Sequence, residues 1–358
     1  MEASGNSDEK INVGMFISKD CTLPYNKLLV DSLKEDGINL LLLDKMSSKW
    51  FKENRGKIDV IHIHWPITFY DSSKKITQWK QVLAFIYFIL LIKKHSYKLV
   101  WTVHNVLPHD RSIFPFYLGN LFLTHFADAL ILHAHSTKKE LKKYFGYTKD
   151  AFVIPYTNYT PYSNVYSHKY SKKKARKELG LPPDKFIYMF FGYIRKYKGI
   201  DIAIRAFQKA KPKNSLFVIA GSYWSDEEKA EIVPLIQNDT NIIASGEEIT
   251  GKKVQQHMSA ADVIVLPYKK ITTSGVLVLA LTFGKPIIGM KKGMVQEWVS
   301  DKNGILVETE AELENALIEI QKKDLNEMSN ESFSLSQKYN WPRISGLYEE
   351  VYKKILHK

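Results

Sequence analysis

Two basic residues lie in a short loop between a predicted strand and a predicted helix. In FFGYIRKYKGIDIAIRAF (190–207) the strand ends at Gly192, Arg195 and Lys198 follow, and the helix begins near Gly199. Backbone amides at a helix N-terminus bind phosphate, and neighbouring cations strengthen that attraction. The glycine spacing matches neither a dinucleotide fingerprint nor a Walker loop, so a solvated basic loop is the alternative interpretation.

A second loop, rich in small polar residues, follows a predicted buried strand within 261–289. Ser274 is placed to cap the apolar helix that comes next. Thr272, Thr273 and Gly275 offer hydroxyl groups and backbone amides to a diphosphate. Simple capping of the helix is the alternative, and for Ser274 we expect capping in either case.

Histidines gather at the ends of two predicted strands, IHIHWP and WTVHNVLPHD. His62 and His64 alternate along their strand, so they share one face. His104 is expected to be exposed at the carboxyl end of its strand, where an imidazole can orient a hydroxyl group or act as a base. With His109 these residues could in principle bind zinc, but no pair has the i, i+4 spacing of a helical site. Structural hydrogen bonding at a strand end is the remaining alternative.

Segments 190–207 and 261–289, in this order, resemble the donor-binding domain of GT-B glycosyltransferases, close to glycosyltransferase family 4 (group 1). The helix–strand junction GKPIIG, the QEW that contains Glu297, and the NGILV turn also match. The last, aromatic-led helix resembles the family's crossing-back helix. The resemblance covers nearly the whole chain and is strongest over 186–308.

The resemblance implies a nucleotide-diphosphate sugar as the donor substrate, bound by the C-terminal domain. Arg195 and Lys198 would neutralise the leaving diphosphate, and stabilising a departing charge is usually a large catalytic effect. His104 would contact the sugar or the acceptor and join these two residues as a catalytic group. No Asp-x-Asp metal motif is present, so neither a metal nor another cofactor is implied. The implied donor-binding set is Gly192, Arg195, Lys198, Thr273, Ser274, Gly275 and Glu297.

The chain departs from the family at two positions. The family often carries two glutamates around the Ser274 helix, and this sequence has Ile271 and Leu279 there. The carboxylate expected to hold the nucleotide ribose is therefore missing, which leaves Glu297 or backbone groups for that contact. The departure also keeps open an inactive, glycosyltransferase-like partner subunit.

Short apolar runs alternate with helical patterns in both halves of the chain. This alternation predicts an α/β protein, and the resemblance makes it GT-B: two Rossmann-like, doubly wound parallel-sheet domains facing a central cleft. The predicted strands are 11–17, 39–44, 58–65, 98–105, 128–134 and 151–156, then 186–192, 215–221, 241–246, 262–268, 286–290 and 304–307.

The expected domain organisation has four parts. Residues 1–10 form a tail, and 11–168 form the acceptor-side domain. Residues 169–335 form the nucleotide-sugar-binding domain, and 336–358 form a helix that packs back on the first domain.

Composition narrows the class of protein further. The 358 residues are 45% hydrophobic and 13% aromatic, which suits packed domains rather than a disordered chain. A single cysteine, Cys21, allows no intrachain disulfide, and the polar first ten residues resemble no secretion signal, so we expect a cytoplasmic protein. The net charge of +13 indicates an anionic partner, unless it reflects only a lysine-rich composition. No nucleic-acid-binding module is recognisable, so nucleic acid is not an expected partner.

The predicted helix from about Thr77 to Lys94 contains an apolar run, 82–92, flanked by Lys80, Lys93 and Lys94. The run is too short to span a bilayer. It is either a core helix or a segment that dips into an anionic membrane surface, with the protein bound peripherally at the inner face.

The leading functional prediction is a glycosyltransferase, as a hexosyltransferase, for cell-surface polysaccharide or glycoprotein assembly. It would transfer sugar to a glycan or lipid-linked acceptor. The inactive partner subunit and a sugar-nucleotide epimerase of the same fold are the alternatives. An epimerase needs acidic catalytic residues, and none is convincingly placed.

Overall fold

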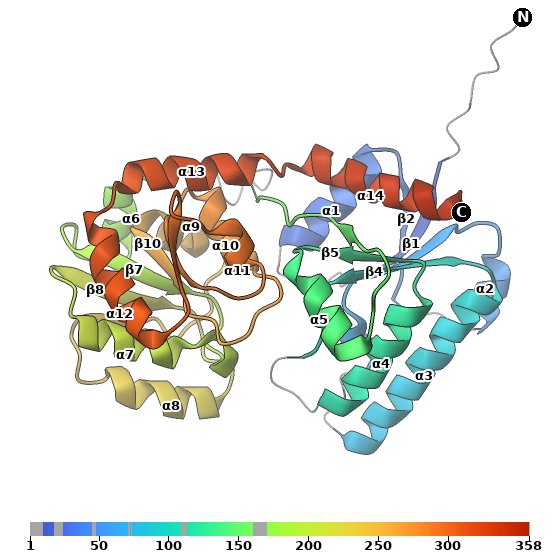
Figure 1. Ribbon diagram of the computed structural model, residues 1–358, viewed down its shortest axis with the longest axis horizontal. Helices are drawn as coiled ribbons and strands as arrows, with labels where there is room; N and C mark the ends of the chain where they lie inside the picture. The colour runs from blue at the N-terminus through green and yellow to red at the C-terminus, as the bar shows by residue number, and fades with distance from the viewer. Residues whose placement is uncertain are drawn as a thin grey trace, which may run out of the picture. The chain divides into compact units, whose positions relative to one another are not determined.

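The computed structural model describes residues 10–17, 24–44, 48–70, 72, 74–108, 113–159 and 170–357 (Figure 1). The chain divides into two compact units: unit 1 is Met1–Pro155 with Trp341–Lys358, and unit 2 is Tyr156–Asn340. The domain boundary expected near residue 168 lies outside the described residues, as do Cys21 and His109. The last helix begins at Trp341 and belongs to unit 1.

Unit 1 is built on a parallel six-stranded sheet in the order β2-β1-β3-β4-β5-β6. Strands β3 and β5 are buried along their whole length and β4 along nearly all of it, as expected for strands covered on both faces. The strands are β1 (Asn12–Phe16), β2 (Asn39–Leu42), β3 (Val60–Ile63), β4 (Lys98–Val103), β5 (Ala129–Leu132) and β6 (Phe152–Val153).

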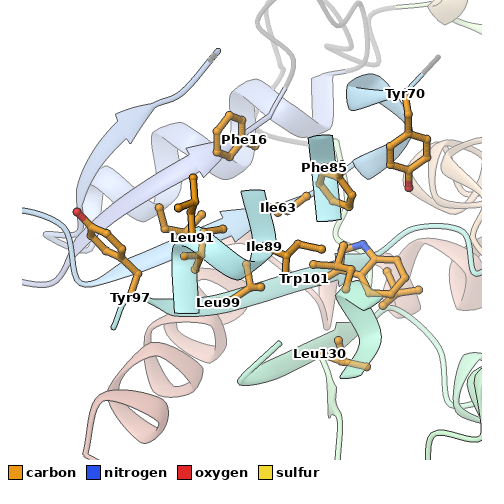
Figure 2. Packing of buried hydrophobic residues seen from close by; sticks show 14 of the residues in the cluster. Phe16, Ile63, Tyr70, Phe85, Ile89, Leu91, Tyr97, Leu99, Trp101 and Leu130 are labelled. Carbon is orange, nitrogen blue, oxygen red and sulfur yellow. The ribbon is translucent and has the colours of Figure 1, made fainter. Parts of the chain in front are cut away.

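Helices cover this sheet, and α3 packs beside α4 while α14 packs beside α1 (Figure 1). Figure 2 shows Phe85 and Ile89 of α3 in the core with Leu99 and Trp101 of β4. The helices are α1 (Pro24–Glu35), α2 (Ser48–Glu53), α3 (Lys75–Lys94), α4 (Ile113–Phe126), α5 (Ser136–Phe145) and α14 (Trp341–Leu356), with a 3-10 turn at Pro66–Phe69.

The apolar run 82–92 is neither wholly core nor wholly surface. Val82, Phe85 and Ile89 are buried, whereas Leu83 is 59% exposed and Tyr87 is 58% exposed. One face of α3 therefore belongs to the core and another lies at the surface, and the docking of α3 on a membrane stays a prediction. By length and composition alone α3 is also the one described helix that could cross a membrane, with 33% of its apolar window buried.

Unit 2 contains a second parallel six-stranded sheet, in the order β12-β11-β10-β7-β8-β9. The chain starts at β7 in the middle, runs outward through β8 and β9, and returns to β10 on the other side of β7. The strands are β7 (Phe186–Phe191), β8 (Ser215–Ala220), β9 (Ile242–Ala244), β10 (Val263–Leu266), β11 (Ile287–Met290) and β12 (Gly304–Val307).

A buried ion pair fastens the first helix of unit 2 to its sheet. Arg176 and Asp262 lie 2.6 Å apart with side chains 5% and 8% exposed, and Asp262 also accepts the Ile187 amide at 2.7 Å. The helices are α6 (Lys172–Glu178), α7 (Ile200–Ala210), α8 (Asp226–Ile236), α9 (Lys252–Ala260), α10 (Gly275–Thr282), α11 (Val295–Trp298), α12 (Glu310–Glu319) and α13 (Leu325–Gln337), with 3-10 turns at Lys196–Lys198 and Ile320–Lys322.

Candidate active site

The strand order of unit 2 creates a crevice at one end of its sheet. Connections from β7 and β10 leave in opposite directions, so a switch point lies between their carboxyl ends. Ligands of open parallel sheets bind at such points. The two loops singled out from the sequence, after β7 and after β10, are the loops that flank it.

Lys198 lies folded over the end of β7. Its side chain is largely buried, and its Nζ lies 3.2 Å from the position that a Cβ would take at Gly192. Gly192 has φ +95°, and its carbonyl oxygen would lie 2.2 Å from a Cβ on Gly221. Both glycines therefore let the backbone approach closely, and the Lys198 ammonium is held at the end of β7.

The first turn of α10 meets the same point. The Val276 Cγ2 lies 3.5 Å from the same Cβ position at Gly192, so the two loops converge there. Ser274 is the N-cap of α10 and accepts the Leu277 amide at 3.1 Å, which confirms the predicted capping. Its hydroxyl also hydrogen-bonds that of Tyr268 at 3.2 Å. A capped helix N-terminus beside a buried lysine is well suited to an anionic group.

Arg195 is held by aromatic rings rather than at the strand end. Its guanidinium carbon lies 4.1 Å from the ring centre of Trp224 and 5.4 Å from that of Tyr197. Trp224 is 48% exposed and meets Tyr193 edge-on at 5.5 Å. Cation–π contacts of this kind fix the direction of a long side chain.

Two glycines lock the loops of this crevice together. Gly199 has φ +68°, and a Cβ there would lie 2.0 Å from the Pro267 carbonyl oxygen. Gly293 has φ +49°, and a Cβ there would lie 2.0 Å from the Ile271 carbonyl oxygen. The loops after β7, β10 and β11 therefore pack backbone against backbone.

The positions where the family carries glutamates hold buried apolar side chains, with Ile271 and Leu279 each less than a tenth exposed. Glu297 is exposed on α11, which begins directly after the loop containing Gly293. The Met294 amide donates to the Thr272 carbonyl at 3.0 Å, which places α11 beside the loop after β10. Glu297 is thus a neighbour of that loop, and its contact with ribose stays a prediction.

Unit 1 collects four histidines at the carboxyl ends of β3, β4 and β5. The ring centres of His62 and His64 lie 4.4 Å apart, so they share a face as predicted. His64 Nδ1 and His104 Nε2 share a hydrogen bond of 3.2 Å, and the ring centres of His104 and His133 lie 5.0 Å apart. His133 was not among the predicted site residues, although it follows an apolar strand just as His104 does.

The predicted exposure of His104 is wrong. Its side chain is only 4% exposed, because the Trp65 indole stacks on it at 3.9 Å with an interplanar angle of 11°. Burial lowers the pKa of His62 to about 3 and that of His133 to about 4. Burial, followed by the neighbouring histidines, holds the pKa values of His64 and His104 well below 6.5. All four imidazoles are therefore neutral at physiological pH.

One carbonyl fixes the direction of a hydrogen-bond chain through this cluster. The Ile154 carbonyl can only accept, so His133 Nδ1 donates to it at 2.9 Å. The His133 Nε2 of the neutral ring then accepts from the Tyr25 hydroxyl at 3.5 Å. Tyr25 in turn accepts from the Tyr348 hydroxyl at 3.0 Å. The cluster thereby ties α1 and α14 to the sheet.

A second branch of the cluster orders His62. Its Nδ1 lies 2.7 Å from the Tyr352 hydroxyl, and its Nε2 lies 2.8 Å from the Thr102 hydroxyl. Across the described ranges, no group of three or more His, Cys, Asp or Glu side chains is arranged to hold a metal ion.

Known proteins share this architecture. The sequence profile of the family described as Glycosyl transferases group 1 matches residues 185–323. The GDP-mannose:glycolipid 4-beta-D-mannosyltransferase of Xanthomonas campestris pv. campestris is 24% identical over 354 residues, covering 94% of this chain and 90% of that protein.

Solved structures with a similar fold cover nearly the whole chain. Sucrose-phosphate synthase from Thermosynechococcus elongatus superposes with a TM-score of 0.75 at 16% identity, covering 97% of this chain and 100% of that one. HepE of Anabaena in complex with UDP-glucose superposes with a TM-score of 0.70 at 17% identity, covering 96% and 100%. At these identities the likeness shows the fold.

The two parallel sheets and their flanking helices define the class of protein: the chain has the GT-B fold, and the fold prediction is confirmed. Within that class, residues 185–323 match the group 1 glycosyltransferase family, and the predicted resemblance to that family is confirmed. The prediction of a hexosyltransferase enzyme is confirmed with it.

Proposed function

We propose that the protein transfers a sugar from a nucleotide-diphosphate sugar to a glycan or lipid-linked acceptor in cell-surface polysaccharide or glycoprotein assembly. The observation that carries this proposal is the convergence of Lys198, Gly192 and the first turn of α10 at the switch point of unit 2. The glycolipid mannosyltransferase among the relatives supports a lipid-linked acceptor. GDP-mannose and UDP-glucose are the donors to test first.

In this proposal Lys198 and Arg195 neutralise the diphosphate as it leaves. The backbone amides and hydroxyls of the α10 N-terminus, from Thr273 to Gly275, bind the same group. Glu297 or nearby backbone groups take the ribose, and His104 contacts the sugar or acceptor. No metal ion and no further cofactor enters the reaction.

Nucleotide release tests the proposal. Purified protein is supplied with each donor, with and without a lipid extract as acceptor, and the freed nucleotide and the glycosylated lipid are both measured. Transfer dependent on both substrates supports a glycosyltransferase. Conversion of the donor sugar without release of nucleotide would instead reveal an epimerase.

Buried apolar residues at the two glutamate positions favour one second candidate, an inactive partner subunit. That candidate predicts nucleotide binding without turnover on any donor. A complete absence of turnover by protein that binds GDP or UDP would favour it.

We further propose that the outward face of α3 docks on an anionic membrane, at the cytoplasmic side. This face carries an apolar stripe at helical spacing, which also meets Phe114 of α4 through Trp79 at 5.7 Å. A stripe of this kind, bordered by lysines, suits the headgroup boundary of a bilayer. The exposed members of the stripe on α3 are Ile76, Trp79, Leu83, Tyr87 and Leu90.

The flanking lysines differ in what they offer to a membrane. Lys80 and Lys94 are exposed, whereas Lys93 pairs with Asp128 at 2.7 Å. Lys80 and Lys94 should therefore contribute more to binding than Lys93.

Flotation on vesicles that contain phosphatidylglycerol tests membrane docking. Wild-type protein should float, and added salt should weaken binding through screening. Leu83→Ser combined with Tyr87→Ser should abolish flotation, whereas Ile318→Ser, at an exposed apolar residue of unit 2, should not. Wild-type protein that stays soluble at low salt would exclude the docking face and favour a soluble acceptor.

A further inference from the structure

A small pocket opens in unit 1 where β3 and β4 end. Its volume is about 50 Å³. Unit 1 has its own switch point beside β3, because β1 pairs with both β2 and β3. That switch point lies between β1 and β3, and the pocket lies one strand further along, at the same carboxyl-end edge of the sheet. Its lining includes His64, Trp65, Tyr70, His104, Asn105 and Asn120.

Two polar side chains of the pocket already have partners within the protein. The Tyr70 hydroxyl donates to Asn120 Oδ1 at 2.6 Å, and Asn120 Nδ2 donates to the Val106 carbonyl at 2.9 Å. These bonds hold the pocket wall in place and leave little for a ligand there.

His64 is different, because one of its nitrogens is unused. Its Nδ1 shares a hydrogen bond with His104, but its Nε2 is buried and has no hydrogen-bond partner within the described part of the chain. The side chain is fully buried and lines the pocket. Native structures seldom leave such an atom unsatisfied, and exceptions call for a ligand, a water or a functional reason.

The His64–His104 hydrogen bond limits what can satisfy this nitrogen. One proton lies between His64 Nδ1 and His104 Nε2. If His64 donates it, His64 Nε2 is a bare acceptor; if His104 donates it, His64 Nε2 carries the hydrogen. A hydroxyl group both donates and accepts, so it fits either tautomer, whereas a carboxylate or an ammonium fits only one.

Size and surroundings narrow the ligand further. One water occupies about 30 Å³ in the liquid, so the pocket admits a hydroxyl or hydroxymethyl group but not a whole sugar ring. Trp65, which is partly exposed, stacks on His104 and forms an aromatic wall beside it. An aromatic wall next to a few placed polar atoms is typical of small-molecule sites.

We propose that this pocket binds one hydroxyl group of the acceptor sugar, through His64 Nε2, with Trp65 as the wall for the ring that carries it. The proposal rests on the proposed function, since it assigns a subsite to the acceptor of that reaction. His64 is then a binding residue that makes two contacts: its Nδ1 orients His104, and its Nε2 contacts the acceptor hydroxyl.

Two substitutions distinguish the roles of the two ring nitrogens of His64. His64→Asn places an amide near the Nδ1 position and keeps a partner for His104, while His64→Gln reaches towards the Nε2 position. The probes are the methyl glycosides of mannose and glucose, each also with single hydroxyls replaced by hydrogen. Binding is followed by tryptophan fluorescence, and Trp65→Leu is the second, less buried variant should the His64 variants not fold.

We expect at least one glycoside to bind the wild-type protein. His64→Asn should lower the affinity for that glycoside about tenfold, which is the scale of one lost hydrogen bond. His64→Gln should keep the affinity within about twofold of wild type. One deoxy glycoside should bind wild type and His64→Asn equally. Trp65→Leu should also weaken the glycoside. GDP and UDP affinity should be unchanged in all variants.

Three results would overturn the proposal: no glycoside binding to wild type, equal glycoside binding by wild type and His64→Asn, or no sensitivity to any deoxy position, as for a pocket that holds only water. Failure of GDP and UDP to bind wild type would refute the proposed function instead. Loss of glycoside binding therefore refutes the hydroxyl subsite, whereas loss of nucleotide binding refutes the proposed function.

Discussion

Acidification should unfold unit 1 through the four histidines that it buries. Their pKa values in the folded state lie well below 6.5, at about 3 for His62 and about 4 for His133. In the unfolded chain each imidazole titrates near 6.5. Below that pH the unfolded state takes up protons that the folded state excludes. Stability is therefore complete above about pH 6.5 and declines as the pH falls towards about 4.

The size of the effect follows from linkage. Each such histidine lowers the free energy of unfolding by about 1.4 kcal/mol for every pH unit below its unfolded pKa. At about pH 5 this amounts to about 2 kcal/mol per histidine, or about 8 kcal/mol for the whole cluster. The whole free energy of unfolding of a domain is typically only about 5–15 kcal/mol, so unit 1 should approach its unfolding midpoint near that pH.

Urea unfolding across this pH range, followed by pulsed hydrogen exchange of peptides from β3 and β4, reports on unit 1 alone. His62→Gln removes one proton site and should reduce the pH slope near pH 5 by about 1.4 kcal/mol per unit. His357→Gln, at an exposed histidine, is the matched control and should leave the slope unchanged. Imidazole NMR signals showing charged His62 in the folded protein at about pH 5.5 would refute the reasoning, as would identical slopes in all three proteins.

Three further predictions concern single residues. Lys198→Ala should lower turnover about a thousandfold, since one ion pair at about 4 Å in a partly buried site is worth about 4 kcal/mol. Arg195→Ala should lower turnover by only about tenfold to a hundredfold, because Arg195 is less buried than Lys198; steady-state kinetics measures both effects, and unchanged turnover in either variant would contradict its assignment. His104→Ala should reduce transfer at least about a hundredfold while donor affinity stays within about twofold; donor binding that collapsed in step with activity would move His104 to the donor site or the fold. Asp262→Ala should destabilise unit 2 by about 3–5 kcal/mol, because it leaves the buried Arg176 charge uncompensated; a loss below about 1 kcal/mol in urea unfolding would contradict a buried pair.

The local structure around Arg195 and Lys198 was predictable because its signals are local. A strand, a glycine, two basic residues and a helix follow one another within 190–207, and the structure forms β7, the turn at Lys196–Lys198 and α7 from them. Capping by Ser274 was predictable for the same reason. The convergence of Lys198 with the α10 N-terminus needed the strand order, which places β10 beside β7.

The histidine cluster was not predictable, because its partners come from far along the chain. Tyr348 and Tyr352 lie on the last helix, and Tyr25 lies on the first. Nothing in the pattern of β3 or β4 indicates that these hydroxyls will cover their ends. Alternation correctly placed His62 and His64 on one face, but the burial of His104 depends on how Trp65 turns back over it.

The central claim is that a nucleotide diphosphate binds at the switch point of unit 2, against Lys198. Calorimetric titration of GDP and UDP into wild type, Lys198→Ala and Lys196→Ala tests it most directly. Lys196 is the matched control, since it lies in the same turn but is exposed and paired with Glu231 at 3.0 Å. We predict that at least one nucleotide binds wild type and Lys196→Ala alike and binds Lys198→Ala at least about tenfold more weakly. Equal affinity in all three proteins would contradict the account.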